Sequence, residues 1–263
     1  NTLVLPPFNY LGMAEYSLEG GINWYITTLN NKLLKKSEST IYWLDLGKLS
    51  QIIGLKNWHD SGLFYQAKYG FSIKFLPEYT NWLSSTIREV YALKPKVLIL
   101  DLDNTLWGGI IGDDGLEGIN LGPETPEGNA FQDFCYYLKA LKSRGIILAI
   151  CSKNEISNVK EVFNRHPHMP LSLDDFSCIK CNWDHKPKNI IEIANELNLD
   201  ISSFVFVDDN PAECELVRSK FKEVKVIQLS NDPSTHISSI DFLNLFNSYS
   251  LSKEDLIRHK SYI

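Results

Sequence analysis

Two carboxylates, Asp101 and Asp103, directly follow the short apolar run at residues 97–100. An unbroken apolar run of this length predicts a buried strand of a parallel sheet. Open α/β sheets bind ligands beyond the carboxyl ends of their strands, where two acids can share a hard cation such as Mg²⁺. A lone Asp-x-Asp is equally typical of a turn, so the interpretation depends on the rest of the chain.

Further polar groups follow later apolar runs in the same way. Ser152 ends a second run, Lys186 opens a helical pattern, and Asp208 and Asp209 follow a third run at residues 204–207. Together these groups suit phosphoryl transfer, in which one carboxylate attacks phosphorus and others bind Mg²⁺. The hydroxyl and the ammonium would hold the phosphoryl oxygens.

These motifs resemble the haloacid dehalogenase superfamily of phosphatases and phosphotransferases. More narrowly, residues 100–115, 150–154 and 206–211 resemble the FkbH-like branch of that superfamily. The resemblance covers the chain from about Lys94 onward. It implies an enzyme that takes a glyceryl unit from 1,3-bisphosphoglycerate and loads it on the phosphopantetheine thiol of an acyl carrier protein. The enzyme then removes the remaining phosphate, and the product serves polyketide biosynthesis as a starter or extender unit.

The resemblance also implies a role for each motif residue. Asp101 would be the nucleophile, forming an aspartyl phosphate, and Asp103 the general acid and base. Ser152 and Lys186 would bind the phosphoryl group, with Lys153 a weaker rival for the lysine role and Lys188 facing solvent. The substrate-binding set also includes the residues that orient the nucleophile loop, Asn104 and Thr105.

The predicted metal ligands are Asp101, Asp103 through its backbone carbonyl, Asp208 and Asp209. The sequence does not decide which of the last two binds Mg²⁺ directly, although related motifs favour Asp209. Cys151 is the one cysteine next to the predicted site. Its thiolate is a hypothetical acyl carrier, but neighbours on a strand point to opposite faces, and buried cysteines are commonly inert. The carrier thiol could instead attack the acyl phosphate directly.

The elements from residue 96 onward alternate as expected for βαβ units. Strands are predicted near residues 97–100, 146–150, 177–181, 204–207 and 224–227, and helices near 126–143, 155–164, 188–198 and 211–220. This pattern predicts an α/β fold, a Rossmann-like parallel sheet with helices on both faces. The glycine-rich stretch at residues 108–122 predicts a small flap instead of a large cap. Trp107 is expected to pack the flap and Trp183 to lie in the core or at the rim.

The first part of the chain carries weaker signals. We predict an accessory region at residues 1–93 and a catalytic domain at residues 94–263. Residues 42–46 predict a strand and residues 71–93 a long helix, which gives a smaller α/β region resembling part of an SGNH hydrolase. No Gly-Asp-Ser motif is present, so we interpret His59 and Asp60 as structural and the region as non-catalytic. A final helix is expected from Ser250 onward.

Composition narrows the classes of function. The chain has 263 residues and a net charge of −6, without a basic run, which disfavours nucleic-acid binding. No apolar run approaches a membrane span and no signal-peptide pattern is seen, so a cytoplasmic protein is expected. The first residue is Asn rather than Met, as in a fragment or a processed chain. Five cysteines are an odd number in a chain of cytosolic character, so disulfides are not expected. The pair Cys178 and Cys181 supplies only two of the four ligands that a structural zinc site usually needs, so zinc is not expected either.

Three hypotheses about function follow. The first is the glyceryl transferase and phosphatase acting on a carrier protein and a phosphorylated three-carbon substrate. The second is a stand-alone Mg²⁺-dependent phosphatase for small phosphoesters or a phosphoprotein. The third, a docking module without activity, conflicts with the complete set of acids, serine and lysine. The first two hypotheses share their predicted residues, so only acyl transfer to a carrier protein separates them.

Overall fold

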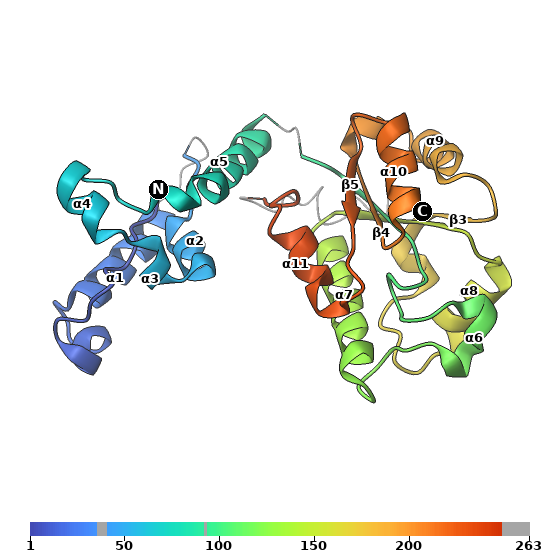
Figure 1. Cartoon of the computed structure of the whole chain (residues 1–263), viewed down its shortest axis with the longest axis horizontal. Helices are drawn as coiled ribbons and strands as arrows, with labels where there is room; N and C mark the ends of the chain where they lie inside the picture. Colours follow the sequence, from blue (N-terminus) through green and yellow to red (C-terminus); the bar gives the residue numbers. More distant parts are fainter. Residues whose placement is uncertain (36–40, 92–93, 249–263) are drawn as a thin grey trace. The chain divides into compact units, whose positions relative to one another are not determined.

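The computed structural model describes residues 1–35, 41–91 and 94–248. The chain divides into two compact units, Asn1–Ala92 and Leu93–Ile263, which are described separately (Figure 1). The helix expected from Ser250 lies outside the described residues, as does the end of the helix expected at residues 71–93. In the described part of the chain, no helix is long and apolar enough to cross a membrane.

The described residues of the first unit form helices and turns. The elements are η1 (Gly12–Tyr16), α1 (Ile22–Lys35), α2 (Leu46–Ile53), α3 (Leu55–Trp58), α4 (Ser61–Ala67), η2 (Ile73–Phe75) and α5 (Leu76–Val90). Pro77 lies in the first turn of α5, where its missing N–H costs no helical hydrogen bond. His59 Nε2 lies 3.3 Å from the Leu5 carbonyl oxygen, and the Asp60 side chain caps α4 by accepting from Leu63 N. Both contacts are structural.

The strand expected at residues 42–46 is wrong. Residues 42–45 form no strand, and Leu46 begins α2 because the Asp45 side chain accepts a hydrogen bond from Lys48 N. Thr2 N donates to the Leu44 carbonyl, but one such bond is not a ladder. The alternating pattern of this segment therefore lacks the partner strand that a sheet requires, and the expected α/β character of the first unit is corrected to helical over its described residues.

The second unit contains a five-stranded parallel sheet. Its strands are β1 (Val97–Leu100), β2 (Ile147–Ser152), β3 (Phe176–Cys181), β4 (Phe204–Asp208) and β5 (Lys225–Gln228), in the order β3-β2-β1-β4-β5. In this register Leu100 lies opposite Ile150 on β2 and Val207 on β4. The predicted α/β fold with a parallel sheet is confirmed.

Helices cover both faces of the sheet (Figure 1). One face packs against α7 (Pro126–Ser143), α8 (Ile156–Arg165) and α11 (His236–Asp241), and the other against α9 (Lys186–Leu197) and α10 (Pro211–Lys220). Side chains alternate across β1: Leu98 and Leu100 enter the first core, whereas Val97 and Ile99 enter the second. Short 3₁₀ turns, η3 (Leu173–Asp175), η4 (Ile201–Ser203) and η5 (Pro233–Thr235), connect these elements.

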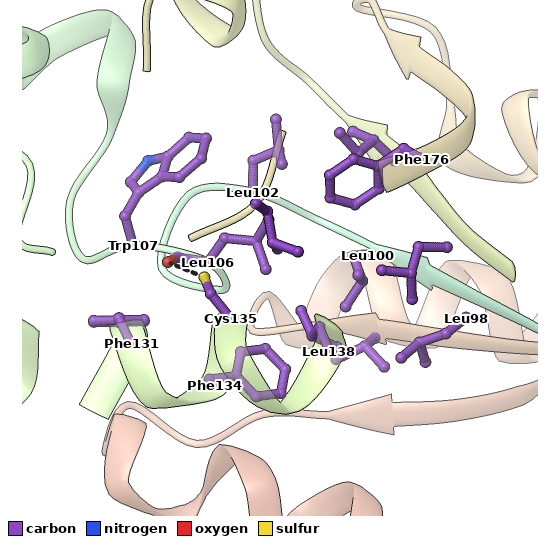
Figure 2. Packing of buried hydrophobic residues seen from close by; sticks show 14 of the residues in the cluster. Leu98, Leu100, Leu102, Leu106, Trp107, Phe131, Phe134, Cys135, Leu138 and Phe176 are labelled. Atoms are coloured by element: carbon purple, nitrogen blue, oxygen red, sulfur yellow. Dashed lines mark hydrogen bonds between the residues drawn. The ribbon is translucent and has the colours of Figure 1, made fainter. Parts of the chain in front are cut away.

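The first core also holds the loop that follows β1. Figure 2 shows Leu102 and Leu106 of this loop among the buried side chains, with Phe134, Cys135 and Leu138 of α7 in the same cluster. The Cys135 thiol donates to the Leu106 carbonyl at 3.5 Å. Burial of each leucine contributes roughly 1.5–3 kcal/mol relative to exposure. The apolar residues of the loop thus fix the backbone that carries Asp101 and Asp103.

The glycine-rich stretch forms a small flap. Gly108 and Asn120 exchange two backbone hydrogen bonds, of 3.0 and 2.8 Å, and close a loop around α6 (Ile111–Gly118). Helix α6 was not predicted, because Gly115 interrupts it with a φ of 66° and no helical periodicity develops over so few residues. No large cap domain fits into this short connection, as expected.

Candidate active site

The register of the sheet brings the predicted residues together at one edge. Asp101 follows β1, Ser152 ends β2 and Asp208 ends β4, and these three strands are neighbours. Lys186 is the first residue of α9, where Pro187 suits the first turn. Each of these residues is at most 8% exposed. The sheet topology, rather than any local motif, assembles this cluster.

Lys186 links two of the acids. Its Nζ lies 3.0 Å from Asp101 Oδ1 and 2.5 Å from Asp208 Oδ2. Burial opposes the charged ammonium, but Asp101 and Asp208 outweigh that effect and raise the pKa of Lys186. The side chain is therefore a fixed cation at the centre of the site.

Asp208 and Asp209 have different surroundings. Asp208 is fully buried, and its two oxygens accept from Lys186 Nζ and from Asn210 N at 2.9 Å. Burial and the nearby Asp101 raise the pKa of Asp208 to about 7, and the same causes raise that of Asp209 to about 6. Asp209, by contrast, lines the open pocket described below. Its carboxylate is therefore the more accessible of the two.

Three carboxylates form a potential cation site. One oxygen of each of Asp101, Asp208 and Asp209 lies within 4.8 Å of the others. Asp101 Oδ1 is buried and receives no well-directed hydrogen bond, even though Lys186 Nζ lies 3.0 Å away. Three carboxylates against one ammonium leave excess negative charge. Hard oxygen donors of this kind fit Mg²⁺. The Asp103 carboxylate does not join this group; its predicted backbone ligand remains a prediction.

Asp103 is held by donors on both oxygens. Oδ1 accepts from Trp107 Nε1 at 2.9 Å and Ile111 N at 3.1 Å, and Oδ2 accepts from Asn154 Nδ2 at 2.9 Å. Burial raises the pKa of Asp103 above its ordinary value, against the lowering effect of these hydrogen bonds. A positioned carboxyl with a raised pKa suits proton transfer. Trp107 is fully buried as expected, but its hydrogen bond to Asp103 was not predicted.

The two residues after Asp103 differ in exposure. Asn104 adopts a left-handed φ of 52°, which Asn tolerates, and its Oδ1 accepts from Gly109 N at 2.9 Å, so it ties the loop after β1 to the flap. Thr105 is fully buried and does not line the pocket. A role in orienting the loop after β1 is compatible with this burial, and its placement in the substrate-binding set stays a prediction.

Ser152 and Asn154 lie beside Asp103. Asn154 Nδ2 lies 3.1 Å from Ser152 Oγ as well as 2.9 Å from Asp103 Oδ2, so one amide orients both groups. Ser152 lines the pocket and can donate its hydroxyl to a bound oxyanion. These contacts are those of a residue that orients the site.

Cys151 points away from the pocket. It is fully buried in the core beneath α9, and its Sγ lies 3.9 Å from the Lys186 carbonyl oxygen. Burial raises the pKa of its thiol to about 12, although Lys186 acts in the opposite direction. A protonated, inaccessible thiol is a poor nucleophile. These observations argue against the acyl-carrier role, and the alternation of side chains along β2 is the reason.

A pocket of about 260 Å³ lies above the acids, and we call it the reaction pocket. It is lined by Asp101, Asp103, Asn104, Ile110, Ser152, Lys153, Trp183, Lys186, Asp209, Asn210 and Glu213. Lys153 forms an ion pair of 2.6 Å with Glu213 instead of reaching the acids. Trp183 is 69% exposed at the rim. Sequence reasoning missed Ile110 and Glu213, since neither belongs to a motif with a chemical signature.

Two other predicted features lie outside this pocket. Lys188 is exposed and forms an ion pair of 2.7 Å with Asp184, as expected for a solvent-facing lysine. Cys178 donates its thiol to the Glu196 carboxylate at 2.8 Å. Neither cysteine of the Cys178 and Cys181 pair belongs to the acidic cluster identified as a potential metal site in the described residues.

Comparison with known structures identifies the family. The chain is similar to the N-terminal part of protein BF1531 from Bacteroides fragilis, whose crystal structure contains a phosphatase domain complexed with Mg. The two share 35% identity with a TM-score of 0.89, over 94% of this chain and 67% of that chain. The chain belongs to the haloacid dehalogenase superfamily.

A second solved structure also matched this haloacid dehalogenase chain. It is 3-deoxy-D-manno-octulosonate 8-phosphate phosphatase from Moraxella catarrhalis in complex with magnesium, phosphate and KDO. It shares 21% identity over 60% of this chain and 92% of that chain, with a TM-score of 0.36. No family model and no curated protein matched the chain.

Proposed function

We propose that the chain is a Mg²⁺-dependent phosphatase that works through an aspartyl phosphate. The observation that carries this proposal is the set of Asp101, Asp103, Ser152, Lys186 and Asp209 around one pocket at the carboxyl edge of the sheet. In this proposal Asp101 is the nucleophile, Asp103 the proton donor, Ser152 and Lys186 the phosphoryl-binding groups, and Asp209 the accessible cation ligand. The similarity to a phosphatase domain complexed with Mg supports the same chemistry.

The residues divide the reaction into two steps. The Asp101 carboxylate attacks phosphorus, the bond from phosphorus to the leaving oxygen breaks, and Asp103 gives its proton to that oxygen. Asp103 then takes a proton from water as the water attacks the aspartyl phosphate, which releases phosphate and restores Asp101. Lys186 and Ser152 stabilise the negative charge of the transferring group throughout.

Asp101 and Asp209, with Asp208 behind them, would hold the cation. When bound, Mg²⁺ supplies positive charge that neutralises phosphoryl oxygens. Because both oxygens of Asp208 already accept hydrogen bonds, we assign the direct contact to Asp209 and a supporting position to Asp208.

A matched pair of lysine variants tests the phosphatase. Lys186→Met and Lys188→Met remove the same charge two residues apart on α9, but only Lys186 faces the acids. With p-nitrophenyl phosphate and Mg²⁺, we expect Lys186→Met and Asp101→Asn to lose at least about a hundredfold in kcat/KM, as for other lost electrostatic contacts. Lys188→Met should retain wild-type activity. Equal activity of both lysine variants would contradict the proposal.

We further propose that the natural substrate is a carrier-bound phosphoglyceryl unit. The carrier thiolate would attack the acyl carbon of 1,3-bisphosphoglycerate and displace phosphate, giving a 3-phosphoglyceryl thioester. Hydrolysis at Asp101 would then release the second phosphate and leave the glyceryl thioester, a polyketide building block in the cytoplasm. The motif resemblance at residues 100–115 supports this assignment, and the small flap leaves the pocket open to a macromolecular substrate.

Intact-protein mass spectrometry separates this activity from a stand-alone phosphatase. A holo acyl carrier protein would be incubated with the chain, Mg²⁺ and fresh 1,3-bisphosphoglycerate. We expect a glyceryl adduct with wild type and a phosphoglyceryl adduct with Asp101→Asn. If no adduct forms with several carrier proteins while Asp101-dependent phosphate release persists, the second hypothesis, a phosphatase for small phosphoesters or a phosphoprotein, is correct.

A further inference from the structure

A second cavity adjoins the reaction pocket and takes part in none of the steps above. It has a volume of about 480 Å³, within the range of small-molecule sites, and it shares Asn104 and Asp209 with the reaction pocket. Its other walls include Gly118 and Asn120 of the flap region and Asn231 in the segment after β5. A substrate held by its phosphoryl group at Asp101 can therefore extend past Asn104 and Asp209 into this space.

The flap side of the cavity is fixed by hydrogen bonds. The Asn120 backbone is paired with Gly108, and Asn120 Oδ1 accepts from Thr125 Oγ1 at 2.6 Å. Thr125 also caps α7 by accepting from Gly128 N at 2.9 Å. This hydrogen bond holds the Asn120 carboxamide, which lines the cavity, in one position.

The opposite side is braced by the core. Phe131 is 6% exposed and packs edge-on against His236 with ring centroids 5.5 Å apart. His236 Nε2 lies 3.1 Å from the Ser230 carbonyl oxygen, which holds the segment that carries Asn231. A cavity with both sides fixed does not need to be ordered by its ligand, which lowers the cost of binding.

The lining of the cavity is selective in charge. Two of the lining residues, Glu127 and Asp209, are acidic. The others are neutral: Asn104, Gly108, Gly109, Gly118, Asn120, Phe131, Ser230, Asn231 and Pro233. The residues that line this cavity include no Lys, Arg or His. The reaction pocket, by contrast, contains Lys153 and Lys186. A second anionic group on the substrate would therefore meet only acids here, whereas amide and hydroxyl groups would meet matching partners.

We propose that this cavity is the subsite for the leaving group and that it takes an uncharged tail bearing amide and hydroxyl groups. The pantetheine arm of the carrier has this chemistry. The inference rests on the proposed phosphatase function and deepens it: the phosphoryl group would lie at Asp101, the glyceryl unit beside Asn104, and the arm along Asn120 and Asn231. The free acid 3-phosphoglycerate, with its carboxylate at the start of the cavity, is disfavoured.

The test compares substrates that share a phosphoryl group but differ in the tail. Phosphate release would be measured with the 3-phosphoglyceryl thioester of pantetheine, with 3-phosphoglycerate and with p-nitrophenyl phosphate. Wild type is expected to prefer the thioester to the acid at least about tenfold in kcat/KM. A tenfold ratio corresponds to roughly the net free energy of one or two hydrogen bonds. Equal values for the two glyceryl compounds would overturn the subsite.

Two exposed residues of the cavity give variants with opposite expected effects. Asn231→Trp fills the space and should lower kcat/KM for the thioester about tenfold more than for p-nitrophenyl phosphate. Glu127→Lys reverses a charge and should raise kcat/KM for 3-phosphoglycerate about tenfold, a gain that misfolding cannot produce. Asn129→Trp is the matched control, since Asn129 is exposed on the same helix as Glu127 but does not line the cavity.

The outcomes separate the two levels of the proposal. If p-nitrophenyl phosphate is hydrolysed with Asp101 dependence but neither cavity variant changes the relative kcat/KM values, the subsite is refuted and the phosphatase stands. If wild type releases phosphate from none of the three compounds, the proposed function fails and the subsite fails with it.

Discussion

Replacing Asp101, the proposed nucleophile, should abolish the proposed activity and stabilise the metal-free protein. The Asp101→Asn variant keeps the shape of the side chain but removes one of three carboxylates that lie within 4.8 Å of one another. In wild type these acids share one close ammonium, Lys186, which remains paired with Asp208 at 2.5 Å in the variant. The variant therefore relieves repulsion without leaving the lysine unpaired.

The size of the effect follows from the distances. The carboxylate oxygens of Asp101, Asp208 and Asp209 lie no more than 4.8 Å apart, and at that limit each repulsion of Asp101 costs about 3.5 kcal/mol at an effective dielectric constant of about 20, or about 7 kcal/mol together. The attraction between Asp101 and Lys186 at 3.0 Å returns about 5.5 kcal/mol on the same scale. The difference favours the variant by about 1.5 kcal/mol. For a unit of this size that corresponds to a rise in Tm of roughly 3–6 °C.

Differential scanning calorimetry in EDTA measures this rise. The measurement is made at pH 8 because the pKa of Asp208 is raised to about 7, so that this carboxylate is charged at the chosen pH. Asp113→Asn, an exposed change on α6, should alter Tm by less than about 2 °C. With saturating Mg²⁺ the order should reverse, because wild type gains about 2.7 kcal/mol at a hundredfold excess over Kd and the variant loses a ligand. A lower Tm for Asp101→Asn in EDTA would refute the reasoning, because attraction to Lys186 would then exceed the repulsion.

Three further outcomes are expected. Cys151→Ala should retain phosphate release and carrier loading, with a loss of stability of about 1–2 kcal/mol from the small cavity; loss of all carrier adducts in a folded variant would instead make the thiol an acyl carrier. Mg²⁺ affinity, measured by isothermal titration calorimetry, should fall as the pH decreases below 7. Burial and Asp101 raise the pKa values of Asp208 and Asp209 to about 7 and 6, so protons compete with the cation for these carboxylates. Equal affinity at pH 8 and pH 5.5 would contradict this. Burial tends to raise the pKa of Asp175, but hydrogen bonds from Lys142 and Ser172 outweigh it and lower the pKa. Its contribution to stability should therefore be present above the unfolded pKa and lost as pH falls through the folded pKa; Asp175→Asn should flatten the acid limb of the Tm–pH curve, and an unchanged limb would exclude this contribution.

Local sequence patterns were sufficient to predict most of the strands and helices of the second unit. The runs that form β1, β2 and β4 are short, predominantly apolar and buried throughout, and burial on both faces of a parallel sheet demands that pattern. The two edge strands, β3 and β5, contain polar residues and are only partly buried. Pro126 and Pro211 marked the first turns of α7 and α10. The same reasoning failed at residues 42–45, because an extended pattern becomes a strand only if another strand is available to pair with it.

Contacts within the site were less accessible to sequence reasoning. The hydrogen bond from Asn154 to Asp103 joins the end of β2 to the loop after β1, residues that are 51 positions apart, so no spacing in the sequence encodes it. The hydrogen bond from Trp107 to Asp103 spans only four residues, but it depends on the conformation of that loop. The burial of Thr105 depends on the core packed around its loop. The second cavity is lined by residues from five separate segments, near residues 104–109, 118–120, 127–131, 209 and 230–233, and none of them carries a recognisable motif for this cavity.

The sequence by itself determined the chemistry that this protein carries: the acids, the serine and the lysine, and the strand ends on which they stand. The tertiary structure decided which of them meet. Parallel pairing places β1 between β2 and β4, and so brings Asp101, Ser152 and Asp208 to one edge. The alternation of side chains along β2 turns Cys151 into the core while Ser152 lines the pocket. The physical reason is that residue type is local, whereas burial, pKa and distance depend on neighbours that only the folded chain supplies.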